Sequence, residues 1–189
     1  MLRFPRLPHL STCTLIGLLA GGAHAETPSP APEPLQPLLA TINERLNIAD
    51  QVALTKWDSG KPIQDSTREA QVIANARKIA IEKNVDADEA AELIAAQIEA
   101  NKLVQYGLIA QWQAARNAPD VPRPDLNQIR PKLDELQSRL LQQYADFVPY
   151  RVDPECPNWL AKERSGLIKD ALHGQALIRA TGELCITDQ

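Results

Sequence analysis

Residues 86–117 read DADEAAELIAAQIEANKLVQYGLIAQWQAARN, a stretch in which apolar residues recur at intervals of three and four. This is the period of an amphipathic helix. Acidic residues occupy the first turn, where they interact favourably with the positive end of the helix dipole. No proline occurs between residues 64 and 118. The stretch therefore predicts one long helix.

Helical spacing also marks the segments on either side of this stretch. The breaks are the turn DSGKP at residues 58–62 and proline-containing loops near residues 119–124 and 149–157. No stretch alternates as a strand does, so the predicted fold class is all-α, a bundle of long helices packed side by side. Besides 86–117, helices are predicted at residues 35–57, from Asp65 or Ser66 onward, at 125–147 and, in a shorter C-terminal region, at 158–181.

The N-terminus has the pattern of a secretory signal peptide. Two arginines precede the apolar run at residues 15–20, and Ala23-His24-Ala25 supplies small residues around a cleavage point. The alternative, a membrane anchor, would need an apolar run of about 20 residues. We expect cleavage after Ala25, a periplasmic or secreted protein, and no membrane attachment afterwards. The proline-rich residues 26–37 predict an extended leader before a domain at 38–189.

Composition and charge exclude several functional classes. With 189 residues and 44% hydrophobic content, the chain can bury the core of one domain. Its formal charge of −4 falls to about −6 after cleavage, because the segment that is removed carries two of the 20 basic residues and none of the 24 acidic ones. An acidic chain without an exposed basic patch predicts no nucleic-acid partner.

Signal cleavage also changes the count of metal-ligating side chains. It leaves His173, Cys156 and Cys185, which are too few for a Cys/His zinc site. Two cysteines in an exported protein predict a disulfide, here one that pins the C-terminal helical region. Two buried free thiols are the alternative.

Polar side chains occupy positions on the apolar faces of the predicted helices. Arg45 and Lys56 lie three turns apart on one face, and Asn101 and Gln105 lie one turn apart on another. Arg139 lies at the edge of a third face. Taken singly, such an arginine usually reaches solvent or pairs with a carboxylate, and such an amide often sets helix register.

The start of the second helix adds Asp65, Arg68 and Glu69, whose simplest role is capping and pairing with the helix dipole. In sum, however, the cations outnumber the acids on these faces. Burying unpaired positive charge costs several kcal/mol per ion, so an anionic ligand is the expected partner. Because arginine binds carboxylates in bidentate geometry, the pattern indicates a small polycarboxylate held inside the bundle.

The sequence offers no side chains for nucleophilic or metal catalysis. His173 stands far from the other polar positions, both mature cysteines are expected to be bonded, and Glu-x-x-His pairs are absent. We therefore expect no metal and no cofactor. The remaining chemistry is catalysis by placement and electrostatics.

The run Glu44-Arg45-Leu46, then Lys56-Trp57, then KPIQDSTRE at residues 61–69, resembles the all-helical chorismate mutases. The signal peptide, the long third helix and the two C-terminal cysteines are similar to the exported, gamma-type subclass. The resemblance extends over most of residues 35–187. It implies an isomerase of aromatic amino acid biosynthesis that converts chorismate to prephenate through a compact, chair-like transition state, with negative charge growing on the ether oxygen.

The resemblance also implies roles for individual residues. Arg45 and Arg139 resemble carboxylate-binding arginines, and Lys56 resembles the lysine that reaches a carboxylate and the ether oxygen. Gln105 stands where the family has the Gln or Glu that donates the second hydrogen bond to that oxygen. Asp65, Arg68 and Glu69 match the family segment that holds the remaining carboxylate and the ring hydroxyl. Asn101 lies at a substrate-binding position where Ser or Thr is common in the family.

Two alternatives stay open at this stage. An isochorismate-pyruvate lyase shares the fold and much of the pocket, and a non-catalytic exported helical protein could bind a carboxylate ligand. The gamma-type resemblance further implies a homodimer in which each protomer holds a complete site.

Overall fold

The computed structural model describes residues 29–123 and 125–186, so the expected signal peptide at 1–25 lies outside the described residues. All regular structure within these ranges is helical, which confirms the predicted fold class. None of the helices in these ranges has the length and hydropathy needed to cross a membrane. The helices are α1 (Leu35–Ser59), α2 (Ser66–Glu82), α3 (Ala87–Ala115), α4 (Leu126–Phe147), the 3-10 turn η1 (Val148–Tyr150), α5 (Cys156–Ser165) and α6 (Ala171–Ala180).

Aspartates set the start of four helices. Asp65, Asp86, Asp125 and Asp170 each accept a hydrogen bond from a backbone N–H in the first turn of the helix that follows. Such a cap satisfies donors that have no partner inside the helix. At the other end of α1, Gly60 adopts a left-handed conformation with φ of 65°, which glycine tolerates without steric cost. The turn at 58–62 therefore ends α1 as predicted, and Asp65 starts α2.

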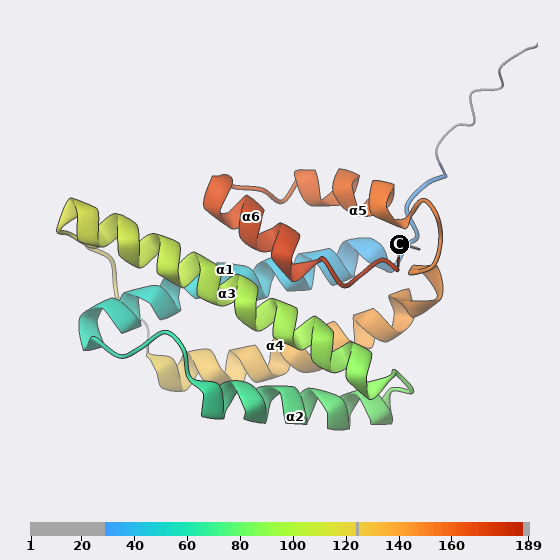
Figure 1. Cartoon of the computed structure of the whole chain (residues 1–189), viewed down its shortest axis with the longest axis horizontal. Helices are drawn as coiled ribbons and strands as arrows, with labels where there is room; N and C mark the ends of the chain where they lie inside the picture. The colour runs from blue at the N-terminus through green and yellow to red at the C-terminus, as the bar shows by residue number, and fades with distance from the viewer. Residues whose placement is uncertain (1–28, 124, 187–189) are drawn as a thin grey trace, which may run out of the picture.

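The helices pack in layers around α1 and α3 (Figure 1). Helices α2 and α4 lie on one side of this pair, and the shorter α5 and α6 lie on the other. Helix α3 contacts α1, α2 and α6, while α1 also contacts α4. The first four helices thus surround a common interior, which is where the polar positions of the sequence converge.

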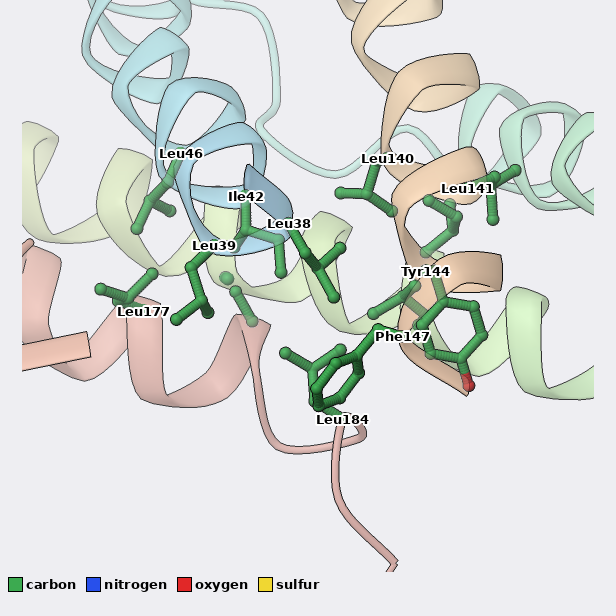
Figure 2. Close-up of a cluster of buried hydrophobic side chains, with 14 of the residues drawn as sticks. Leu38, Leu39, Ile42, Leu46, Leu140, Leu141, Tyr144, Phe147, Leu177 and Leu184 are labelled. Atoms are coloured by element: carbon green, nitrogen blue, oxygen red, sulfur yellow. The ribbon is translucent and has the colours of Figure 1, made fainter. Parts of the chain in front are cut away.

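The core is aliphatic and extends over several helices. Figure 2 shows leucines and an isoleucine of α1 facing the apolar side of α4, with Leu177 and Leu184 closing the cluster from the C-terminal region. Tyr144 and Phe147 are the largest fully buried side chains. Burying each such side chain contributes about 1.5–3 kcal/mol, so this cluster holds α1, α4 and α6 in fixed relative positions.

The C-terminal region predicted as helical at 158–181 is helical in the structure. It forms two helices, because the chain turns at residues 166–170 and Asp170 caps a new helix by accepting from the backbone N–H of His173. The predicted disulfide is present: Cys156 and Cys185 are bonded, with their Cα atoms 5.8 Å apart. It joins the first residue of α5 to the segment after α6, so it links the two ends of this C-terminal extension, residues 156–185.

Two further contacts attach this extension to the rest of the protein. The buried ring of His173 lies between Asp170 and, on α1, Asp50, with Nε2 2.8 Å from an Asp50 oxygen. The Trp159 ring nitrogen donates to the carbonyl of Ser29 in the segment predicted as a leader. Residues 35–37, where the predicted leader and the predicted first helix overlap, form the first turn of α1, in which proline is tolerated.

Candidate functional site

A cleft of about 180 Å³ lies among the first four helices, with polar groups on every wall. Five cationic side chains line it, against three carboxylates. The cations are Arg45, Lys56, Arg68, Lys102 and Arg130, and the carboxylates are Asp65, Glu69 and Asp134. The cleft is therefore cationic inside a protein whose overall charge is negative.

Arg45 forms the floor of the cleft and is only 8% exposed. Its guanidinium donates to the backbone carbonyl of Leu133 on α4 at 2.9 Å. Burial lowers the pKa of Arg45 to about 10, and the negative charge of Asp134 partly opposes this shift. The group remains charged at neutral pH. Because Leu133 is the one acceptor for its guanidinium among the described residues, most of its five N–H donors stay available to a ligand.

Lys56 lies near the end of α1, where the chain turns into the α1–α2 loop. Its ammonium donates to the carbonyl of Pro62 in that loop at 2.6 Å. The bond restrains the side chain in the lining of the cleft and uses one of the three N–H donors of the ammonium. The loop residues at 58–62, noted in the sequence as a helix stop, thus also orient this lysine.

Asn101 and Gln105 form a pair on α3, one turn apart, as the sequence predicts. The Gln105 amide donates to the Asn101 side-chain oxygen at 2.7 Å, and Asn101 donates weakly to the backbone carbonyl of Arg45 at 3.4 Å. Gln105 is 5% exposed, and its Oε1 atom is buried without a hydrogen-bond partner among the described residues. A buried polar atom without a partner is costly, so this amide is suited to bind a ligand.

The start of α2 carries Asp65, Arg68 and Glu69 into the cleft. Asp65 accepts from the backbone N–H of Arg68 at 3.0 Å, and Glu69 accepts from the backbone N–H of Asp65 at 3.1 Å. This reciprocal cap fulfils the simpler role considered for both acids. The Arg68 guanidinium lies 3.1 Å from a carboxylate oxygen of Asp134 on α4.

Arg139 is not brought to the cleft. It lies on the exposed side of α4 and pairs with Glu44, as does the neighbouring Lys132. The cleft instead receives Arg130, which the sequence analysis missed. The two arginines are nine residues apart, about two and a half helical turns, so they point to opposite sides of α4.

The ion pairs divide the cationic side chains into two groups. Arg68 pairs with Asp134, and Lys102 pairs with acids on α2 and α3. In the parts of the chain that the structure describes, Arg45, Lys56 and Arg130 form no ion pair. Three cations without a carboxylate partner around one cleft fit a ligand with more than one negative charge.

Comparisons with known proteins agree with this arrangement. The family model for chorismate mutase type II matches residues 36–106, which comprise most of α1, all of α2 and most of α3. A secreted chorismate mutase from Mycobacterium tuberculosis is 30% identical over 194 residues, covering 98% of this chain and 97% of the relative. A secreted chorismate mutase from Mycolicibacterium smegmatis is 31% identical over 180 residues, covering 93% and 99% respectively.

A solved structure extends the similarity to the fold. The crystal structure of chorismate mutase from Burkholderia phymatum aligns with a TM-score of 0.79 at 41% identity, covering 82% of this chain and 97% of that one. Sequence similarity thus extends over nearly the whole chain, and the helices superimpose across most of it. The chain belongs to the chorismate mutase family.

Proposed function

We propose that the cleft binds chorismate and converts it to prephenate, and that the protein is an exported chorismate mutase. The observation that carries the proposal is the buried Arg45 together with Lys56 and Arg130, three cations around a single cleft that have no carboxylate partner within residues 29–123 and 125–186. Chorismate supplies two carboxylates. The family relationship supports this substrate over other dianions.

The roles follow from what each side chain can donate. Arg45, Arg130 and Arg68 bind the two carboxylates, with Arg130 taking the place first expected for Arg139. Lys56 and Gln105 donate to the ether oxygen, where negative charge grows as the C–O bond breaks. Asp65 and Glu69 accept from the ring hydroxyl, and Asn101 orients Gln105.

The proposed mechanism needs no group that becomes covalently attached to the substrate. Holding both carboxylates selects the compact conformer from which the rearrangement proceeds, which lowers the entropic barrier. Two donors fixed before the reaction stabilise the transition state more than the ground state, because the charge on the ether oxygen is larger there. A rotation of both amides by 180° would keep a hydrogen bond between Asn101 and Gln105, with Asn101 now donating, and would turn the Gln105 N–H toward the position of the unpartnered Oε1.

Export is supported by the N-terminal signal pattern, by the disulfide and by relatives named as secreted. We further propose that the mature protein is a homodimer in which each protomer holds a complete cleft. Light scattering of the purified mature protein tests this state, since a monomer mass would contradict it.

The direct test is an ultraviolet assay of the purified mature chain with chorismate, in the presence of a chelator. We expect loss of chorismate with matching formation of prephenate and no pyruvate. Release of pyruvate would favour the lyase alternative. Binding of chorismate without turnover would favour the non-catalytic one.

A further inference from the structure

Among the residues that the structure describes, Lys102 is the cleft cation that pairs with two acids. It follows Asn101 on α3, and its ammonium lies 3.1 Å from Glu69 on α2 and 2.7 Å from Glu99 on its own helix. Its side chain is 13% exposed, whereas the lysines of the other ion pairs are more than 40% exposed. A lysine that is half-buried and paired with a cleft carboxylate does not form an ordinary surface salt bridge.

Both oxygens of Glu69 are held by different parts of the fold. Oε1 accepts from the backbone N–H of Asp65, and Oε2 accepts from Lys102. A carboxylate has about four acceptor sites, so capacity for a donor from the cleft remains. Without Lys102, only the bond to the start of α2 would orient the carboxylate.

Lys102 itself has little left to offer a ligand. Hydrogen bonds to Glu99 and then to Glu69 raise the pKa of its ammonium against the opposing effect of burial, so it stays charged at neutral pH. Two of its three protons are directed at these carboxylates. Any effect on the reaction therefore passes through Glu69.

We propose that Lys102 is a positioning residue that holds the Glu69 carboxylate where it accepts the ring hydroxyl of the substrate, and that it thereby sets the preference of the cleft for a hydroxylated ring. This rests on the proposed function, in which Glu69 is the hydroxyl acceptor. The hydroxyl is not part of the bond changes, so the contact is the same in ground and transition states. Its loss therefore raises KM more than it lowers kcat.

The test uses Lys102→Met, which keeps the stem and removes the charge. The substrates are chorismate and an analogue with hydrogen in place of the ring hydroxyl. Hydrogen bonds to charged groups are stronger than those between neutral groups, so we expect KM for chorismate to rise about tenfold or more, with kcat within about threefold. For the analogue, parent and variant should have the same KM.

Three further variants make the result specific. Lys102→Arg should restore most of the affinity, and Glu99→Gln, which removes the partner outside the cleft, should change KM by less than about threefold. In a protein that already carries Glu69→Gln, the addition of Lys102→Met should leave KM unchanged. An equal loss for both substrates, or additive effects of these two changes, would overturn the proposal.

Two controls separate this proposal from the assignments on which it rests. A parent protein without mutase activity would contradict the proposed function instead. A Glu69→Gln variant that keeps the parent's preference for chorismate over the analogue would contradict the hydroxyl role of Glu69. If Lys102→Met does not fold, judged by its thermal transition, Lys102→Gln replaces it.

Discussion

Two arginines of this protein are equally buried and have opposite surroundings. Arg151, 7% exposed, pairs with Glu89, donates to the carbonyls of Glu183 and Leu184, and lies over the Tyr144 ring at 5.1 Å. Arg45, 8% exposed, has a single carbonyl as its partner among the described residues. The first holds the C-terminal segment in place, and the second is left for a ligand.

The difference shows how burial and pairing together separate structure from function. A buried cation with a full set of protein partners contributes to stability, because removing it leaves those partners unpaired. A buried cation with few partners destabilises the free protein and is retained because it binds something. The same distinction separates Lys56, which pairs with no carboxylate in the described part of the chain, from Lys102, which pairs with two. Substitutions of these cations test this division.

The largest effect is expected at Lys56, the proposed donor to the ether oxygen. Loss of one such donor typically costs about 3–4 kcal/mol of transition-state stabilisation, so Lys56→Ala should lower kcat by about a hundred- to a thousandfold, with a smaller change in KM. Steady-state kinetics with chorismate measure both. The matched control is Lys61→Ala, which removes an exposed lysine of the adjoining α1–α2 loop. Unchanged turnover in Lys56→Ala would exclude the proposed role.

The two buried arginines should respond in opposite ways to the same substitution. Arg45→Met should lower kcat/KM more than a hundredfold, a loss of about 3 kcal/mol of transition-state stabilisation. Urea denaturation should show that this variant is as stable as the parent or more stable. Arg151→Met should lower the free energy of unfolding by about 3 kcal/mol, because Glu89 loses its partner, and leave kcat/KM of the folded protein unchanged. If both variants lost activity alone, or both lost stability alone, the proposed difference between the two arginines would be contradicted.

Gln105 gives a prediction about pH. An amide donates at any pH, whereas a glutamate at this position must be protonated to donate. Gln105→Glu should therefore lose about a hundredfold in kcat at pH 8, and its activity relative to the parent should rise as pH falls. The exposed Gln111→Glu on the same helix is the control. Identical pH profiles for Gln105→Glu and the parent would contradict the proposed hydrogen bond.

The helices and the C-terminal disulfide could be predicted because their signals are local. Apolar spacing, prolines and capping aspartates act within a few residues. Two cysteines in an exported chain allow a single intramolecular pairing. The loop at 166–170 inside the predicted helical region could not be placed, because residues 158–181 keep helical spacing while Asp170 favours a new helix start. Propensity alone does not decide between these outcomes.

The site was predicted less completely, and α4 shows why. On α1 and α3 the polar residues interrupt clear apolar faces, so Arg45 and Gln105 stood out. On α4, Arg139 was chosen for its place between buried leucines, but the side of the helix that faces the cleft is set by packing against α1 and α2. The available signal was the spacing of Arg130, Asp134 and Gln137, which places three polar side chains on one face.

The smallest effects separate these two arginines of α4. Arg130→Ala should lower kcat/KM for chorismate by a factor equivalent to about 2 kcal/mol, because one charged hydrogen bond to a carboxylate of the substrate is lost. Arg139→Ala breaks only an exposed ion pair with Glu44, so it should change both activity and the free energy of unfolding by less than about 1 kcal/mol. Kinetics and urea denaturation of the two variants, measured side by side, provide the check. If Arg139→Ala lost more activity than Arg130→Ala, unpaired charge in the cleft would no longer identify the residues that bind substrate.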